Sequence, residues 1–302
     1  MYDIIVVGAG PAGLTSAIYA RRADKSVLVI ERSTFGGQIT HSPRVENYPG
    51  FIRMSGVEFA DKLVEQTLAL GADIELDTVV GIEGDTGNFT VKTEGGEYNS
   101  KTVIIAAGSH HRMLGIDRET DFTGEGVSYC AVCDGAFYKD KTVAVIGGGN
   151  SALQEAVLLS DICKKVYVVQ NLAFLTGETK LQDDLNGRSN VEFILSATVD
   201  SIIGDTDFKG INITVDGEKR ELLCDGIFVA IGQVPENQPF ADAVALDERG
   251  YITAGEDCLP QSKNGIFVAG DCRTKAIRQI TTATADGAVA ALAACKLCDD
   301  LK

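Results

Sequence analysis

The amino-acid sequence predicts an α/β protein in which parallel strands alternate with helices. The first observation is a short apolar run at residues 2–7 (YDIIVV), which a glycine-rich turn follows at residues 8–13 (GAGPAG). The second is a repeat of this pattern at residues 142–152, where TVAVI precedes GGGNSA. The third is its partial return at residues 265–271, again before a helix-forming segment. These observations predict two Rossmann-like domains of the FAD/NAD(P)-binding type, with the second inserted in the first.

The individual elements follow from short apolar runs that are bounded by glycine. In the first domain we expect strands at residues 2–7, 26–30 and 103–107, and a helix that ends near Arg22. In the second domain we expect strands at residues 142–146 and 166–169, joined by a helix that ends at about Asp161. Later strands are expected at residues 226–231 and 265–269, and a helix at residues 284–297. The first domain is therefore placed at residues 1–113 and 242–302, and the inserted domain at residues 114–241.

The chain is acidic: 27 lysines and arginines stand against 43 aspartates and glutamates, which gives a formal net charge of −16. This balance argues against nucleic acid or an anionic membrane surface as a partner. No basic segment precedes a signal-like apolar core, and no apolar run is long enough to span a membrane. We expect a soluble, cytoplasmic protein that binds neither nucleic acid nor membranes.

The first glycine-rich turn has the full context of a dinucleotide-binding site. It follows a strand, opens a helix, and has Glu31 at the end of the next strand, 18 positions after Gly13. Glycines let the backbone approach a pyrophosphate at the helix N-terminus, where free N–H groups favour negative charge. Glu31 is expected to accept hydrogen bonds from the adenosine ribose, and the ligand is FAD or NAD.

Cys130 and Cys133 form a Cys-x-x-Cys pair that precedes the second glycine-rich turn by fourteen residues, which is typical of a redox-active dithiol. The other six cysteines are expected to be reduced thiols. A second such pair, Cys295 and Cys298, lies on a predicted helix, and we interpret it as small packed residues rather than as a redox or metal site. All three histidines fall outside residues 114–241, which excludes a Cys–His pair within the inserted domain, and no zinc-site spacing is present, so no metal is predicted.

Several further segments resemble the low-molecular-weight thioredoxin reductases over essentially the whole chain. They are residues 35–38 (FGGQ), 45–50 (VENYPG), 106–108 (AAG), 270–271 (GD) and 278–280 (RQI). The resemblance implies FAD as the cofactor, with Asp271 near the ribityl chain and Arg278 with Gln279 around the isoalloxazine and phosphates. The expected FAD-binding residues are Gly8, Gly10, Pro11, Ala12, Gly13, Glu31, Arg32, Gly36, Gly37, Gln38, Asn47, Val79, Ala107, Gly108, Gly270, Asp271, Arg278, Gln279 and Ile280.

The same resemblance assigns roles around the dithiol, because Cys130-Ala-Val-Cys133-Asp134 fits the family's motif. It implies that Cys133 faces the flavin and that Cys130 attacks the disulfide of thioredoxin through a mixed disulfide. Asp134 is placed to donate and accept the proton that thiolate chemistry requires. Asp134 can also be an N-cap of the following segment, and both roles are compatible. A homodimer is implied by the resemblance alone.

The second glycine-rich turn is an incomplete nucleotide site. Gln170 lies 18 positions after Ala152, where an NAD site has an acidic residue. NADPH-using members of the family carry His-Arg-Arg-x-x-x-Arg from this position, whereas this chain has QNLAFLTG and no arginine from residue 119 to residue 187. We therefore favour a structural role for this turn over a nicotinamide site of altered specificity.

This loss resembles the ferredoxin-dependent flavin thioredoxin reductases, which keep FAD and the dithiol without the NADPH residues. Reduced ferredoxin is therefore the expected electron donor, and a basic patch would be needed to attract it. The candidate basic residues are Lys139, Lys141, Lys164, Lys165 and Arg188. Alternatives that stay open are an NADPH- or NADH-dependent reductase, a diflavin-linked oxidoreductase, and a flavin-binding redox sensor without turnover.

Overall fold

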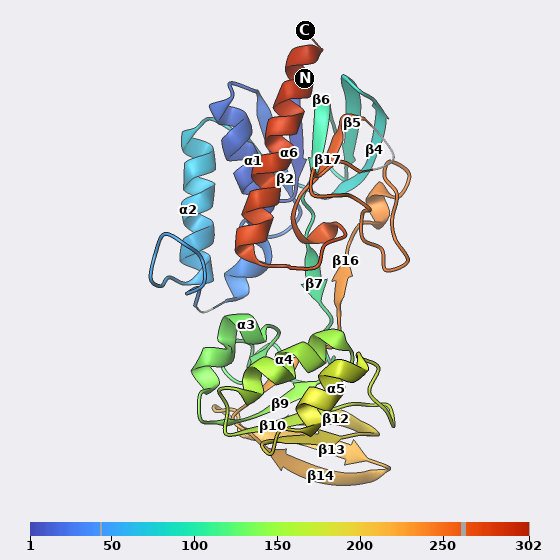
Figure 1. Ribbon diagram of the computed structural model, residues 1–302. Helices are drawn as coiled ribbons and strands as arrows, with labels where there is room; N and C mark the ends of the chain where they lie inside the picture. The colour runs from blue at the N-terminus through green and yellow to red at the C-terminus, as the bar shows by residue number, and fades with distance from the viewer. Residues whose placement is uncertain (43, 261–263, 302) are drawn as a thin grey trace. The chain divides into compact units, whose positions relative to one another are not determined.

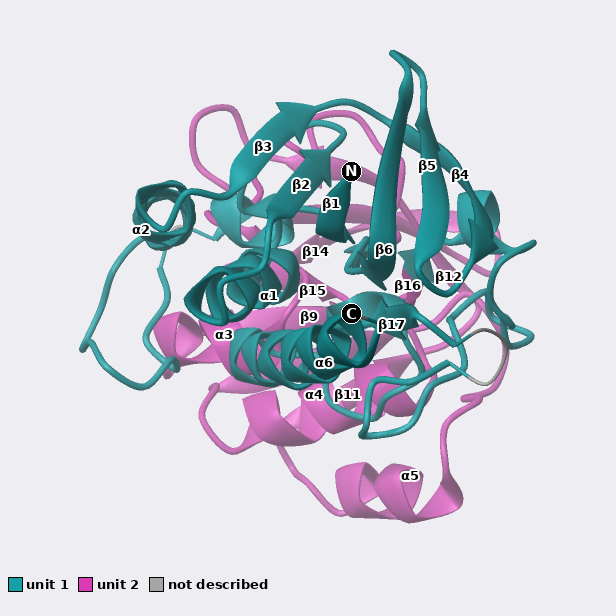
Figure 2. Cartoon of the chain, turned by 90° about the horizontal axis from the view of Figure 1, so that it is seen from above, with its two compact units in different colours: residues 1–110, 234–302 teal, residues 111–233 magenta. Residues whose placement is uncertain are grey.

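The computed structural model describes residues 1–42, 44–260 and 264–301. The chain forms two compact units: unit 1 consists of residues 1–110 and 234–302, and unit 2 of residues 111–233 (Figure 2). Each unit contains a parallel sheet with helices packed against it, which confirms the predicted fold class.

Unit 1 is built on a seven-stranded sheet in the order β3-β2-β1-β6-β5-β4, with β17 also paired to β6. Its parallel strands are β1 (Tyr2–Val7), β2 (Val27–Glu31), β3 (Asp73–Leu76), β6 (Glu97–Ile105) and β17 (Ile266–Val268). An antiparallel hairpin of β4 (Val79–Asp85) and β5 (Asn88–Thr93) pairs with the first half of β6, and β17 pairs with the second half. The sequence analysis missed this hairpin, because its strands are half exposed and lack a continuous apolar run.

Three helices lie on one face of the unit 1 sheet: α1 (Pro11–Arg22), α2 (Gly56–Ala69) and α6 (Ile280–Asp300) (Figure 1). Ile4 and Val6 of β1 pack in the core beneath these helices, whereas Ile5 and Val7 pack in a second core on the opposite face. The central strands are therefore buried on both faces, which is why they are continuous apolar runs. Unit 1 also contains the short helices η1 (Gly37–His41), η3 (Gln238–Phe240) and η4 (Gly270–Cys272).

The last helix, α6, is longer than the predicted span of residues 284–297. Gln279 caps its N-terminus in a capping box with Thr282, so the helix begins at Ile280. The capping pair is Gln and Thr instead of the usual Ser or Thr followed by Glu or Gln, and the sequence analysis did not recognise it.

Unit 2 contains a five-stranded parallel sheet in the order β11-β10-β9-β15-β8. These strands are β8 (Val127–Ser128), β9 (Thr142–Ile146), β10 (Lys165–Val169), β11 (Val191–Ile194) and β15 (Gly226–Val229). The helices are α3 (Ala131–Asp134), η2 (Gly135–Tyr138), α4 (Asn150–Ser160) and α5 (Thr179–Asn186). A separate antiparallel sheet, which the sequence analysis did not predict, is formed by β12 (Ala197–Ile203), β13 (Gly210–Val215) and β14 (Glu218–Leu223).

The two chain segments that connect the units pair with each other, as β7 (Ser109–His111) and β16 (Gln233–Pro235). The units divide at 110/111 and 233/234, whereas the sequence analysis placed the boundaries at 113/114 and 241/242. The second difference arises because Phe240 is buried with Phe89 and Ile252 in the core of unit 1. His111 consequently belongs to unit 2, which corrects the expectation that every histidine lies outside the inserted domain.

In the part of the chain that the structure describes, no helix combines the length and apolar character needed to cross a membrane.

Candidate active site

The first glycine-rich turn joins β1 to α1 with a backbone that only glycine permits at two positions. Gly8 has φ +106°, and a Cβ there would collide with the carbonyl oxygen of Ala106. A Cβ at Gly13 would collide with the carbonyl oxygen of Gly8. Pro11 is the first residue of α1, where its missing N–H costs no intrahelical bond. The turn thus brings the start of α1 close to the ends of β1 and β6.

Glu31 is buried at the end of β2, and its carboxylate holds the glycine-rich turn. Its Oε2 accepts a hydrogen bond from the Ala9 N–H at 2.7 Å, and its Oε1 accepts from the Ser33 N–H at 3.0 Å. Oε1 also accepts from the Ser33 hydroxyl at 3.4 Å, whereas Oε2 keeps a second lone pair for a ribose hydroxyl.

A cavity of about 470 Å³ opens beside this carboxylate within unit 1. Five of the residues expected to bind FAD line it: Gly8, Glu31, Arg32, Val79 and Ala107. The cavity is large enough for part of a dinucleotide, and small-molecule sites commonly have this size.

Two lining residues of this cavity were missed by the sequence analysis. Glu236 forms an ion pair with Arg32, and His110 Nδ1 lies 3.4 Å from the same carboxylate. His110 lies in β7 and Glu236 directly follows β16, and neither short strand carries a motif, so no sequence signal identified them.

The segment around η1 lies against the glycine-rich turn. The Gly36 N–H donates to the Ala9 carbonyl at 2.7 Å, and Gly37, with φ +61°, packs against Gly10. Gln38 is exposed, as is Asn47, whose Nδ2 donates to Gln279 Oε1 at 3.1 Å. The structure therefore brings the segments of residues 8–13, 36–38, 47 and 279 together in unit 1, although they are far apart in sequence.

Asp271 lies in η4, directly after β17, and one of its oxygens has no partner. Its Oδ1 is buried without a hydrogen bond to any described residue. Burial raises the pKa of this carboxyl to about 6, against the opposing effect of Lys275 and Arg278. A buried acceptor without a donor fits a ligand hydroxyl, such as one of the ribityl chain.

The η4 turn is anchored to α6 by a buried ion cluster. Asp286 accepts from the Gly270 N–H at 3.0 Å, from Arg273 Nε and Nη2 at 2.9 Å each, and from Lys275 Nζ at 2.8 Å. Arg273 is only 1% exposed, so its charge depends on this partner. The cluster fixes Gly270 and Asp271 relative to α1 and α6.

Arg278, which was expected around the cofactor, also binds the protein backbone beside η4. Its guanidinium donates to the carbonyl oxygens of Asp271, Lys275 and Arg273 and stacks on the Tyr251 ring at 4.2 Å. The guanidinium therefore orders the backbone before α6. Gln279 caps α6, and Ile280 is the first residue of that helix.

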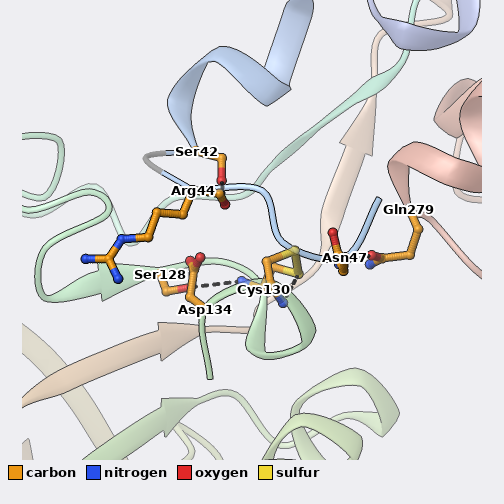
Figure 3. The surroundings of a disulfide bond; sticks show 8 residues. Ser42, Arg44, Asn47, Ser128, Cys130, Asp134 and Gln279 are labelled. Carbon is orange, nitrogen blue, oxygen red and sulfur yellow. Dashed lines mark hydrogen bonds between the residues drawn. A yellow bond between two sulfur atoms is a disulfide. The ribbon is translucent and has the colours of Figure 1, made fainter. Parts of the chain in front are cut away.

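The Cys130–Cys133 disulfide lies in unit 2 at the start of α3 (Figure 3). Cys130 is the N-cap of α3, and its Sγ accepts from the Cys133 N–H at 3.2 Å. After reduction, the same N–H would stabilise a thiolate on Cys130, because hydrogen bonds to the charged form lower a pKa.

Ser128 links the dithiol to Asp134, as Figure 3 shows. The Cys130 N–H donates to Ser128 Oγ at 3.2 Å, and Ser128 Oγ donates to Asp134 Oδ2 at 2.6 Å. The alternative role of Asp134 as an N-cap is wrong: it precedes η2 but makes no side-chain cap hydrogen bond there. Next to Cys130, the Tyr129 ring stacks on His111 at 5.4 Å, which places a histidine in the same unit as the dithiol.

The second glycine-rich turn is covered by the segment that follows β10. The Gly148 carbonyl accepts from the N–H groups of Thr176 and Gly177 at 2.8 and 2.9 Å. Gln170 is 6% exposed and lies against Gly148, where it fills the space of a Cβ. Segment 170–177 therefore packs on the turn.

An acidic side chain occupies the N-terminus of α4, beside this turn. Asn150 is the first residue of α4; its Nδ2 donates to Glu178 Oε1 at 3.0 Å, and its Oδ1 accepts from the Glu178 N–H at 2.7 Å. A carboxylate at this place repels the phosphates of a nucleotide.

The remaining six cysteines are buried free thiols, in agreement with the prediction that they are reduced. Cys295 and Cys298 lie on α6, and burial raises the pKa of both thiols. Among the residues that the structure describes, no cluster of His, Cys, Asp and Glu suits a metal ion.

Comparison with known proteins identifies the class of protein to which this chain belongs. The family model described as pyridine nucleotide-disulphide oxidoreductase matches residues 2–287. The chain belongs to this class of flavin-containing disulfide oxidoreductases.

Within this class, the chain belongs to the low-molecular-weight thioredoxin reductase family. It is 41% identical to the thioredoxin reductase of Listeria innocua, over all of this chain and 95% of the relative. The crystal structure of thioredoxin reductase from Streptococcus pyogenes shares 38% identity and a TM-score of 0.95, over 99% of both chains. A ferredoxin-flavin thioredoxin reductase from Clostridium acetobutylicum shares 32% identity and a TM-score of 0.53, over 98% of this chain and 97% of the other.

FAD is the cofactor of this family, and the residues of unit 1 fit it. The glycine-rich turn, the cavity beside Glu31 and the unpartnered oxygen of Asp271 provide a place for pyrophosphate, adenosine and ribityl groups respectively.

Proposed function

We propose that the protein is a thioredoxin reductase that passes electrons from FAD through the Cys130–Cys133 disulfide to thioredoxin, and that reduced ferredoxin supplies these electrons. Membership of the family supports the reaction. The choice of donor rests on the residues around the second glycine-rich turn. The strand-end position of an NAD site's acidic residue is occupied by Gln170, and segment 170–178 has none of the cations of an NADPH site.

Bound FAD stores one or two electrons, which allows one-electron input and two-electron output. The Cys130–Cys133 bond breaks on uptake of two electrons. The Cys130 thiolate then attacks a disulfide sulfur of thioredoxin, and the Cys133 thiolate resolves the mixed disulfide, which releases the thioredoxin dithiol and restores the Cys130–Cys133 bond. Asp134, held by Ser128, exchanges the proton of the attacking thiol.

A pyridine nucleotide would meet unfavourable charges at the second turn. The 2′-phosphate of NADPH is usually bound by arginine, but residues 170–177 contain no lysine, arginine or histidine. Glu178 adds a negative charge at the N-terminus of α4, where pyrophosphate would otherwise bind.

A nicotinamide-dependent reductase is the second candidate. The glycine-rich turn of unit 2 keeps its glycines, and Gly147 has φ +133°. The description of the matching family model also names pyridine nucleotides. A buried amide such as that of Gln170 can also accept a hydrogen bond from a ribose. A diflavin-linked enzyme and a redox sensor remain as outcomes of the tests below.

The first prediction distinguishes these donors by anaerobic titration of the flavin. We expect reduced ferredoxin to bleach the flavin absorbance, and NADPH and NADH at micromolar concentrations to leave it unchanged. Rapid bleaching by either nucleotide would favour the second candidate. Two flavins per chain would indicate the diflavin type, and failure of the chemically reduced flavoprotein to reduce any thioredoxin would indicate a sensor.

The homodimer and the cytoplasmic location are also part of this proposal, on the basis of family membership. The molecular mass in solution, measured by light scattering, tests the first, and localisation of the native protein by cell fractionation tests the second.

A further inference from the structure

Glu155 is a half-buried residue of unit 2 whose carboxyl group the proposed reaction does not use. It lies in the second turn of α4, and α4 packs against α3, which carries Cys133 and Asp134. The backbone N–H of Ala131, the residue that follows Cys130, is close enough to this carboxyl to lower its pKa. Glu155 is thereby connected to the loop that holds both sulfur atoms.

The environment of Glu155 favours its neutral form. Its Oε2 is buried, and no described residue forms a hydrogen bond with it. An ionised carboxylate without full hydrogen bonding is costly in such a place. Burial, together with the smaller effect of the negative charge of Asp134, raises the pKa of Glu155 to about 8 against the opposing effect of the Ala131 N–H. Glu155 therefore holds a proton at neutral pH.

Of the elements packed against α4, only α3 brings a charged group, Asp134, that shifts the Glu155 pKa. Strand β9 has no titratable side chain. The titratable groups on β10 and α5 do not contribute to the shift; they are Lys165, Tyr167, Lys180, Asp183 and Asp184. On the dithiol side, Tyr129 precedes Cys130; its ring stacks on His111, and its hydroxyl donates to Glu119 Oε1 at 2.9 Å.

We propose that Glu155 is a positioning residue for the Cys130–Cys133 dithiol, which holds a proton and acts through Asp134 and the first N–H of α3 without touching the sulfur atoms. This inference rests on the proposed function, because it requires a redox-active dithiol. Reduction of the disulfide takes up two electrons from the reduced cofactor and two protons from solvent. A neutral Glu155 lets the attacking thiol of this dithiol lose its proton next to Asp134 without a further negative charge on α4.

The proposal has a thermodynamic consequence. Because like charges disfavour each other, a thiolate strengthens the hold of Glu155 on its proton, and an ionised Glu155 makes the dithiol state less favourable. Wild-type protein therefore takes up more protons on reduction, at mildly alkaline pH, than a variant that cannot ionise at this position. A purely structural glutamate, which only accepts the Ala131 N–H, has no such effect.

The test compares Glu155→Gln with wild type and with Glu221→Gln. The amide introduced by Glu155→Gln keeps the size of the side chain and an acceptor for Ala131, but it does not titrate. Glu221 is an exposed residue of β14, so its replacement makes the same chemical change on the surface of the same unit. Each holoenzyme is equilibrated anaerobically with oxidised and reduced dithiothreitol, from about pH 6 to about pH 10, which brackets the ordinary pKa of a thiol and that of Glu155. Alkylation and mass spectrometry of the Cys130–Cys133 peptide then give the equilibrium constant for reduction.

We expect the ratio of this constant, wild type over Glu155→Gln, to fall roughly three- to tenfold as the pH rises through this range, which corresponds to a coupling of about half to one pKa unit. The ratio of wild type over Glu221→Gln should stay constant. A constant ratio for Glu155→Gln, with a dithiol that still exchanges, would overturn the inference and leave the proposed function intact. A Cys130–Cys133 pair that does not exchange with dithiothreitol in any of the proteins would instead contradict the proposed function.

A second measurement uses the wild type alone, in case Glu155→Gln does not fold. Infrared difference spectra of the disulfide and dithiol states should contain a carboxylic-acid carbonyl band that shifts on reduction and disappears as the pH rises above about 8. The absence of any titrating carboxylic-acid band would overturn the inference.

Discussion

Cys130 has a structural role and a chemical role. Serine can keep the structural role, so we expect Cys130→Ser to fold normally while losing the chemistry. The Cys130 Sγ caps α3 by accepting the Cys133 N–H, and it also forms the disulfide. Serine is a favourable N-cap residue, so its hydroxyl can take over the capping bond. A hydroxyl cannot take part in thiol–disulfide exchange.

Replacement of Cys130 by serine should therefore abolish thioredoxin reduction while FAD stays bound. The FAD-to-protein ratio from absorbance and a single-turnover assay with the dithionite-reduced enzyme measure the two properties. Cys163→Ser, which removes a buried thiol elsewhere in unit 2, is the control and should keep the activity. Retained reduction of thioredoxin by Cys130→Ser would show that the active pair is assigned wrongly.

The residues around FAD show how far a sequence alone leads. The glycine-rich turn and Glu31 could be predicted because backbone geometry and spacing restrict the residue types at these positions. The ion pair of Glu236 with Arg32, and the position of His110 beside it, could not, because they depend on how two distant chain segments meet. For Arg278 the motif suggested a cofactor contact, and the structure adds hydrogen bonds from its guanidinium to backbone carbonyls that the motif did not indicate.

At the scale of secondary structure, the buried parallel strands were predictable and the antiparallel ones were not. Strands β1 and β9 have the predicted bounds, and β2 and β10 differ from prediction by one residue at one or both ends, because all four are nearly continuous apolar runs. The β4–β5 hairpin and the β12–β14 sheet alternate exposed and buried positions over short lengths, and such patterns are weak signals.

The connection between η4 and α6 gives a prediction for Asp286. Asp286→Asn removes the only carboxylate that pairs closely with both Arg273 and Lys275 in the described residues, and a buried cation would lose its partner. Breaking such a pair costs about 3–5 kcal/mol in the free energy of unfolding. The pKa of Asp286 is lowered in the folded state, so this stabilisation is present at neutral pH and is lost as the pH falls through that lowered value.

Urea unfolding of the holoenzyme measures this loss for Asp286→Asn. Glu83→Gln is the control, because it breaks the exposed pair with Lys92 and should leave the urea midpoint unchanged. A weaker retention of FAD by Asp286→Asn is also expected, because the Gly270–Asp271 turn loses its anchor. Equal midpoints for all three proteins would contradict the role of the cluster.

At the scale of the whole molecule, charge sets the conditions for a protein electron donor. The net charge of −16 repels an acidic ferredoxin, so association depends on local positive charge. Two of the five candidate basic residues are engaged, since Arg188 pairs with Asp161 and Asp184, and Lys165 pairs with Glu192. The other three, Lys139, Lys141 and Lys164, are exposed in unit 2, and the backbones of Lys141 and Lys164 are hydrogen-bonded to each other.

Replacement of Lys139, Lys141 and Lys164 by glutamine should slow flavin reduction by ferredoxin at low ionic strength, by roughly tenfold, and weaken its dependence on salt. Stopped-flow absorbance measures the rate. The matched control replaces Lys209, Lys219 and Arg220, which are exposed elsewhere in unit 2, and makes the same change in net charge. Equal rates for the two triple variants would mean that these lysines do not guide the donor.

The paired connectors β7 and β16 have a consequence for the evolution of this family. Because the chain leaves and re-enters unit 1 through two neighbouring strands, the whole of unit 2 is a single insertion whose ends lie together. Substitutions at residues 170–178 can therefore accumulate without altering any strand pairing of unit 1. This arrangement allows the electron donor to change during evolution through substitutions in unit 2, while the flavin-binding residues of unit 1 are conserved.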